Sequence, residues 1–395
     1  RRQHARETRR MSTRPRQAAI VGLHVTKQAR RLEGRTQLDL LMEAADGALV
    51  DAAINARDVD GAAIAWPGPG GVPNEVGSWA SFFKLPLAFT NEHWSDTAGA
   101  RGILKAAAAI EAGLCETVVI GSGTAGQFSS GSVGVGDGIE FADVYGSTAM
   151  AQFALVMRRY MYEYGVGPEP FAHVAATIRN HGHVNPEAVM FGAGPYTVAD
   201  VLASPLIAAP LHRLECALVA EGACAIVMTT LERARDLPNT PVLVLGGGME
   251  FHGAAYANPP FLSEMGLMGQ DAVRRTFKAA GAAPDDVDVF CLYDAVAFEV
   301  VRQFEMLGFC KRGEGAAFTA GDRLTLKGDC PTNLDGGILS HSWIGTGQLT
   351  LKAIECTRQL RRACGERQVR DAELALATNA GSGARHIEMA LFGRA

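Results

Sequence analysis

The residues best placed to do chemistry in this 395-residue chain lie at a turn between an apolar strand and an alanine-rich helix. The predicted strand covers 85–89, the polar turn runs through 90–99, and the helix continues to Gly113, a residue type that often ends helices. Enzymes of the α/β class present reactive groups at such junctions, because the helix N-terminus favours negative charge. Asp96 lies in this turn and is therefore a candidate catalytic residue. The alternative is that Asp96 only caps the helix.

Composition limits the class of protein. With 48% hydrophobic residues, the chain can bury a large core, and its length allows two or three domains. The net charge of −5 and the lack of a basic patch argue against a general nucleic-acid binder. No apolar run is long enough to cross a bilayer, and there is no signal segment. The 8 cysteines form no CxxC pair, which predicts a reduced, cytoplasmic protein without a metal site.

One order of elements occurs twice along the chain. Each copy reads strand, helix, the tripeptide Asp-Val-Asp, and a second strand; the copies comprise 17–22, 38–54, 58–60 and 61–65, then 241–246, 269–280, 286–288 and 289–292. This pattern indicates a duplicated α/β unit, with chance similarity as the alternative. An apolar stretch at 214–229 also predicts a strand, interrupted at Glu221 and Gly222.

The repeat and the polar segment 231–241 predict the domain organisation. Residues 1–16 are arginine-rich and are expected to be disordered or to precede the natural start. Residues 17–235 form the first half, which includes an inserted loop region, and residues 236–395 form the second half. A glycine-rich stretch at 121–138 lacks the pattern of a nucleotide-binding loop and is expected to be a flexible loop.

Several motifs along the chain resemble those of thiolases. The stretches that carry the resemblance are 210–216 with 221–225 (the end of the first thiolase half), 288–297 (the "H-D-x-F" segment), 333–340 ("N-x-x-G-G-x-x-S") and 379–383 ("C-x-G-G-G"). The resemblance runs from about Gln17 to the C-terminus and is closest to the sterol-carrier-protein type of thiolase. It implies the α/β thiolase fold, a duplicated, five-layered αβαβα arrangement of two similar halves.

The working groups of thiolases are nevertheless replaced in this chain. By the resemblance, the nucleophilic cysteine corresponds to Asp96, the activating histidine to Tyr293 and the second cysteine to Asn379, and the histidine of "G-H-P" falls at or near Trp343. A carboxylate is a poor acyl acceptor, whereas thiolase chemistry needs an activated thiol. Ordinary thiolysis is therefore not expected.

A thiolase pocket without a thiol still offers a slot for an acyl-CoA thioester and dipoles that stabilise an enolate. A reverse aldol reaction uses that enolate, because a base deprotonates a β-hydroxyl, the Cα–Cβ bond breaks, and an acid reprotonates Cα. The Tyr293-Asp294 pair and the segment 309–315 resemble the thiolase-like aldolases of bacterial steroid side-chain degradation. This resemblance implies a carbon–carbon lyase that cleaves a β-hydroxyacyl-CoA with a steroid or other bulky side chain.

The resemblance also ranks the candidate catalytic residues. Tyr293 is the first, Asp96 the second and His341 the third, and Asn379 is expected to donate a hydrogen bond to the thioester oxygen. In the aldolase branch a second tyrosine follows the "G-G-x-x-S" turn, but here the run 340–343 reads Ser-His-Ser-Trp. Which of the three groups is the base and which the acid is therefore left open.

We expect Trp343, Gly381 and Tyr256 to line the substrate pocket. The resemblance implies that coenzyme A binds only as part of the substrate, and that the chain forms a homodimer joined to a small subunit with an OB-fold and a zinc ribbon. Acyl transfer, as in a thiolase or lipid-transfer protein, is one alternative function, and a reactive free cysteine would favour it. A non-catalytic assembly subunit is the other alternative.

Overall fold

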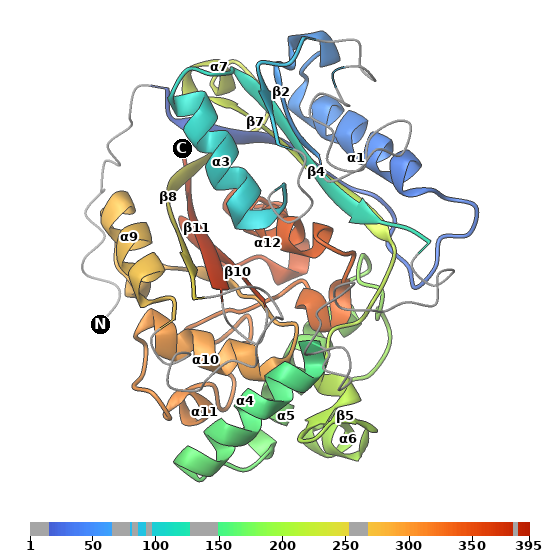
Figure 1. Cartoon of the computed structure of the whole chain (residues 1–395), viewed down its shortest axis with the longest axis vertical. Coiled ribbons are helices and arrows are strands. Elements are labelled where there is room, and N and C mark those ends of the chain that lie inside the picture. Colours follow the sequence, from blue (N-terminus) through green and yellow to red (C-terminus); the bar gives the residue numbers. More distant parts are fainter. Residues whose placement is uncertain are drawn as a thin grey trace.

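A mixed sheet of nine strands runs through the protein in the order β3-β2-β4-β7-β1-β8-β11-β10-β9 (Figure 1). The computed structural model describes residues 16–64, 80, 86–91, 97–126, 149–252, 268–381 and 386–395. The strands are β1 (Ala18–Val25), β2 (Gly61–Ile64), β3 (Phe89–Thr90), β4 (Thr117–Thr124), β7 (Gly222–Thr230), β8 (Val242–Phe251), β9 (Val289–Cys291), β10 (Leu374–Gly381) and β11 (His386–Arg394).

The two parts of this sheet repeat one pairing pattern. In the first half-sheet, β1 pairs antiparallel with β7, β7 antiparallel with β4, and β4 parallel with β2. In the second half-sheet, β8 pairs antiparallel with β11, β11 antiparallel with β10, and β10 parallel with β9. The half-sheets join where β1 pairs with β8 at two positions, Ala19 with Leu243 and Ile20 with Val242. The predicted duplication of an α/β unit is thus confirmed.

Helices lie between and outside the half-sheets. In the central layer, α3 (Gly99–Glu111) and α12 (Gly347–Leu360) contact each other and strands of both half-sheets. Helix α1 (Gln37–Ala52) packs on the outside of the first half-sheet, and α9 (Gln270–Ala280), with α10 (Ala297–Leu307) beside it, on the outside of the second (Figure 1). The layers therefore follow the order αβαβα, as the sequence predicts.

An insertion between β4 and β7 forms the lower part of the view in Figure 1. It contains α4 (Ala149–Tyr164), α5 (Glu169–Val184), α6 (Val198–Ala203) and the hairpin of β5 (Leu206–Ala208) with β6 (Leu211–His212). Two short helices lie elsewhere, α7 (Leu231–Ala234) after β7 and α11 (Gly315–Phe318) after α10. Helix α5 packs against α10 and against a π-helical turn at Gly337–His341, so the insertion contacts the second half of the chain.

The predicted strand at 214–229 is wrong in its first part. The structure has a 3-10 turn at Arg213–Glu215, and β7 begins only at Gly222. The cause is Arg179 on α5, which is buried and donates hydrogen bonds to the carbonyl oxygens of Leu214 at 2.6 Å and Cys216 at 2.9 Å. Because these carbonyl groups are bound to α5, the apolar residues around them do not continue the sheet.

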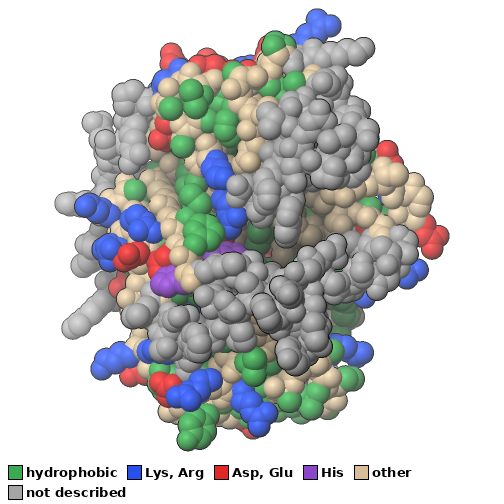
Figure 2. All heavy atoms as spheres, viewed as in Figure 1, with side chains coloured by type: hydrophobic (Ala, Val, Ile, Leu, Met, Phe, Trp, Pro, Cys, Tyr) green, Lys and Arg blue, Asp and Glu red, His purple; other side chains and the backbone are tan. Residues whose placement is uncertain are grey.

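Charged side chains of both signs are interspersed over the described part of the face in Figure 2. Among the described helices, none combines the length and the apolar character needed to span a membrane. Residues 1–15 of the predicted N-terminal segment 1–16, residues 127–138 of the predicted loop 121–138, and residues 253–267 lie outside the described residues. The first residues of that predicted loop, 121–124, belong to β4 instead. The predicted boundary between 235 and 236 stays a prediction.

Candidate active site

The N-terminus of α3 is held by side chains from the second half of the chain. Its N-cap residue is Ala98, whose side chain makes no capping hydrogen bond. Instead, Thr350 Oγ1 on α12 accepts a hydrogen bond from the Gly99 N–H group at 3.0 Å. The Asn379 amide on β10, oriented so that both of its polar atoms have partners, accepts from the Ala100 N–H group at 2.8 Å. Two of the N–H groups that a helix start leaves without partners are therefore satisfied across the central layer.

This close packing explains why a glycine begins α3. A Cβ atom at Gly99, whose φ is +58°, would lie 2.3 Å from the side-chain amide of Asn379 and 2.6 Å from Leu349 Cβ. Asn379 and the helix start can therefore approach each other only because position 99 has no side chain. Asp96 lies two residues before Ala98 and outside the described residues, so its predicted catalytic role stays a prediction.

Tyr293 comes to the same region because β9 and β10 are parallel neighbours. The ladder between them ends where Cys291 faces Ala377, and both chains then leave in the same direction. The Tyr293 N–H group donates to Thr378 Oγ1 at 2.9 Å, one residue before Asn379. Tyr293 is only 5% exposed. The structure thus brings the main chain of Tyr293 next to the part of β10 that carries Asn379, whose amide binds the start of α3.

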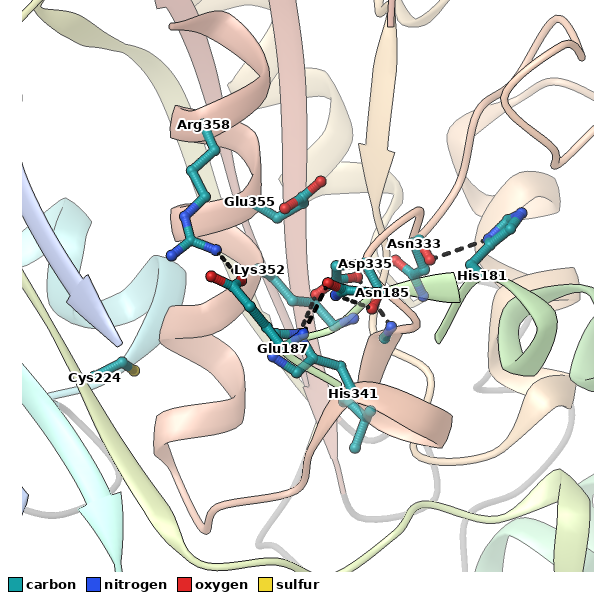
Figure 3. A network of polar contacts seen from close by, with 12 residues as sticks. His181, Asn185, Glu187, Cys224, Asn333, Asp335, His341, Lys352, Glu355 and Arg358 are labelled. Carbon is teal, nitrogen blue, oxygen red and sulfur yellow. Dashed lines mark hydrogen bonds and ion pairs between the residues drawn. The ribbon is translucent and has the colours of Figure 1, made fainter. Parts of the chain in front are cut away.

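His341 lies in the π-helical turn and forms a buried pair with Asp335. Its Nδ1 lies 2.9 Å from Asp335 Oδ2, and the His341 side chain is 4% exposed (Figure 3). A carboxylate only accepts hydrogen bonds, so in the neutral imidazole Nδ1 carries the proton and Nε2 is the acceptor. Nε2 is buried and has no hydrogen-bond partner among the described residues. This nitrogen is therefore suited to accept a proton.

The charge of Asp335 is stabilised by its neighbours. Burial alone would raise the pKa of this carboxyl group, but the hydrogen bond from His341, the Lys352 ammonium group and the Gly337 N–H group together lower the pKa below its ordinary value. Asn185, from the insertion, donates to the Asp335 carbonyl oxygen at 2.8 Å (Figure 3). The insertion therefore helps to fix the turn that carries His341.

Asp294 connects the Tyr293 segment to this turn. Its fully buried carboxylate accepts from Lys352 Nζ at 2.7 Å and from the Ile338 N–H group at 3.0 Å. A Cβ atom at Gly337, where φ is +57°, would lie 2.0 Å from Asp294 Oδ2, so only glycine allows this contact. Lys352 and Asp335 were not predicted from the sequence. For Lys352 the available signal was a lysine within the otherwise uncharged run 349–354.

The cysteines give no sign of a reactive thiol. The free cysteines, 115, 216, 224, 291, 310, 330, 356 and 364, all lie within the described ranges, and each is buried except Cys310, which is half-buried. Burial raises the pKa of Cys115, Cys216 and Cys310 to about 12, which leaves little thiolate at neutral pH. The thiolase cysteine positions hold Asp96 and Asn379 instead.

The residues predicted to line the pocket are only partly described. Trp343 is half-buried, and its main-chain N–H group donates to the Leu218 carbonyl oxygen at 2.9 Å. Gly381 is the last residue of β10, and Tyr256 lies outside the described residues. Their contacts with a substrate stay predictions. In the part of the chain that the structure describes, no group of three His, Cys, Asp or Glu side chains is arranged to hold a metal ion.

Comparison with known proteins agrees with this geometry. Residues 264–394 match the thiolase C-terminal domain-like family. The chain is 33% identical to a steroid side-chain-cleaving aldolase of Thermomonospora curvata, over 85% of this chain and 88% of that protein. It is also 33% identical to a 17-hydroxy-3-oxo-4-pregnene-20-carboxyl-CoA lyase of Mycobacterium tuberculosis, over 83% and 88%. Its fold matches the solved Ltp2-ChsH2(DUF35) aldolase with a TM-score of 0.80 and 30% identity, over 96% of this chain and 98% of that chain.

Proposed function

Because the chain belongs to the thiolase superfamily, in the branch that contains the steroid side-chain-cleaving aldolases, we propose that it cleaves a β-hydroxyacyl-CoA by a reverse aldol reaction. One observation carries this proposal beyond the likeness. The position of the thiolase histidine holds a buried tyrosine whose main chain binds β10 one residue before Asn379, while no cysteine lies at the start of α3. These residues support proton transfer without a cysteine nucleophile.

The reaction needs two proton transfers and a group that stabilises the negative charge of the enolate. A base removes the proton of the β-hydroxyl, the new carbonyl forms as the Cα–Cβ bond breaks, and the electron pair moves into the thioester to give an enolate. An acid then protonates Cα and releases the shortened acyl-CoA. Tyr293 is the first candidate for one transfer, and His341 Nε2 or Asp96 for the other. The second amide hydrogen of Asn379 is the candidate donor to the enolate oxygen.

The proposed substrate and partner subunit are based on the relatives. Their names support a CoA thioester with a steroid-type side chain as substrate, so coenzyme A would enter this chain only as part of that substrate. The name of the Ltp2-ChsH2(DUF35) aldolase joins two components, which supports a partner subunit. We propose that this partner is small and has an OB-fold and a zinc ribbon. We also propose that the chain forms a homodimer and is located in the cytoplasm.

The decisive experiment is an assay with a β-hydroxyacyl-CoA, on the chain purified together with its partner subunit. Tyr293→Phe should lower kcat at least ~100-fold, the usual contribution of an acid or base group. Tyr160→Phe is the matched control, because Tyr160 is also a buried tyrosine and lies on α4. Full activity of Tyr293→Phe, or inactivation of the wild type by iodoacetamide at a cysteine, would contradict the proposal.

A further inference from the structure

Two fully buried side chains close a ring of hydrogen bonds around the main chain of Tyr293. The Tyr293 N–H group donates to Thr378 Oγ1 at 2.9 Å, and the Thr378 hydroxyl donates to Gln303 Oε1 at 2.5 Å. Gln303 Nε2 then donates to the Tyr293 carbonyl oxygen at 2.7 Å, which completes the ring. Thr378 lies on β10 and Gln303 on α10, and both are 0% exposed. Strand and outer helix therefore meet at the peptide groups of one residue.

The ring binds the Tyr293 peptide groups beyond the end of a strand ladder. The ladder between β9 and β10 ends where Cys291 faces Ala377, although β10 itself continues to Gly381. A buried peptide group is stabilised when its N–H and C=O groups are hydrogen-bonded. Asn333 Nδ2 binds the Leu292 carbonyl oxygen at 2.9 Å, and the ring binds both peptide groups of Tyr293. The main chain after β9 is thus fixed by side chains.

Gln303 has no donor hydrogen left for a substrate. Its Nε2 atom carries two hydrogens, and one goes to the Tyr293 carbonyl oxygen and the other to the Glu299 carbonyl oxygen at 2.9 Å. Its Oε1 atom accepts from Thr378. Any contribution of this side chain to activity must therefore act through the position of Tyr293.

We infer that Gln303 and Thr378 are positioning residues, which hold the Tyr293 main chain so that its phenol reaches the reacting carbon or oxygen atom. This inference rests on the proposed function, because it assigns two further residues, which act through Tyr293, to the same site. Misplacement of a reacting group by about 1 Å can lower a rate by up to ~100-fold. Loss of the Thr378 hydroxyl should therefore lower kcat and leave KM nearly unchanged.

The test is a double-mutant cycle on kcat, measured on the complete enzyme with its partner and a β-hydroxyacyl-CoA. Thr378→Val keeps the shape of the side chain and removes the hydroxyl, and it should lower kcat at least ~10-fold. In the Tyr293→Phe background the same change should have no further effect on kcat, because no phenol hydroxyl is left to be misplaced. Thr378→Ser should restore most of the activity.

Thr276→Val is the matched control. Thr276 is also 0% exposed, and its hydroxyl binds the Ala272 carbonyl oxygen at 2.8 Å within α9. This variant should keep its kcat in both backgrounds. If Thr378→Val fails to fold, Gln303→Met breaks the same ring from α10 and replaces it in the cycle.

The outcomes separate this inference from the proposed function. If Tyr293→Phe loses activity but Thr378→Val or Gln303→Met lowers kcat by the same factor in both backgrounds, the ring is merely structural and only the inference is overturned. If Tyr293→Phe is fully active, the proposed role of Tyr293 fails, and the positioning role fails with it. If Tyr293→Phe loses activity and Thr378→Val lowers kcat only in the wild-type background, both the proposed function and the positioning role are supported.

Discussion

The two helices of the central layer, α3 and α12, occupy related places and contribute to the site in opposite ways. Helix α3 buries small apolar residues along most of its length, and it faces the site with its N-terminal end. Helix α12 is buried almost all round, and its buried residues include polar and charged ones: Thr350, Lys352, Glu355, Thr357 and Gln359. Helix α3 thus offers a helix terminus, whereas α12 offers side chains.

This difference shows where the site is stabilised. The peptide groups at the start of α3 bind Thr350 and Asn379, both from the second half of the chain. Lys352 on α12 binds Asp294 beside Tyr293 and helps to keep Asp335 ionised. The polar interactions around the candidate site therefore depend mainly on the second half, although the thiolase nucleophile position belongs to the first.

The largest effect should follow from removing the charge that α12 contributes. Lys352→Met leaves the fully buried Asp294 carboxylate without its ion-pair partner, so we expect a loss of about 3 to 5 kcal/mol in the free energy of unfolding. Urea unfolding measures this loss. Lys278→Met, at an exposed position of α9, is the control and should change stability by less than ~0.5 kcal/mol.

A double variant checks the cause of this loss. In Lys352→Met with Asp294→Asn, no unpaired charge remains, so the double variant should be more stable than the sum of the two single changes predicts. Strict additivity would show that Lys352 stabilises α12 by packing alone, and the contrast between the two central helices would then be weaker.

The sequence predicted most elements of the fold because their apolar residues recur with a clear period. Helix α1 has one covered face, and the predicted 38–54 is close to the observed Gln37–Ala52. Helix α12 is covered on all sides, so the sequence pattern does not show that Lys352 and Glu355 are buried. Tyr293 and Asn379 were found through the resemblance, whereas Gln303 and Thr378 carry no motif and become visible only when β9, β10 and α10 meet.

A medium effect on the free energy of unfolding should follow from lowering the pH, because it titrates His386 near Arg101 of α3. Burial, together with the nearby Arg101 on α3, lowers the pKa of His386 from 6.5 to about 4. Below pH 6.5 the unfolded chain binds a proton at this histidine and the folded chain does not, so stability falls as the pH falls toward 4 and is fully present above 6.5. Between pH 6.5 and pH 5 this loss should amount to roughly 2 kcal/mol.

His386→Gln tests this prediction, because it removes the titrating group. Urea unfolding at pH 7 and pH 5 should show a smaller loss of stability for the variant than for the wild type. An unchanged loss would mean that other groups cause the acid sensitivity. Arg101 would then affect this part of the structure only through its ion pair with Glu388.

The smallest effect, and the most direct test of how the two helices depend on each other, concerns Thr350. Its hydroxyl accepts from the Gly99 N–H group and lies 3.0 Å from Ser122 Oγ on β4. Thr350→Val should therefore cost about 1 kcal/mol, the usual value for a lost helix cap. Hydrogen exchange should show faster opening of the first turn of α3, although the change lies on α12.

Thr357→Val is the matched control, since Thr357 is also fully buried on α12 and its hydroxyl binds the Ala353 carbonyl oxygen of its own helix, at 2.8 Å. It should cost less than ~0.5 kcal/mol and leave exchange in α3 unchanged. Equal effects of the two variants on α3 would mean that α12 stabilises it only by apolar packing. A selective effect of Thr350→Val would show that the start of α3 is fixed by a side chain from the opposite half of the fold.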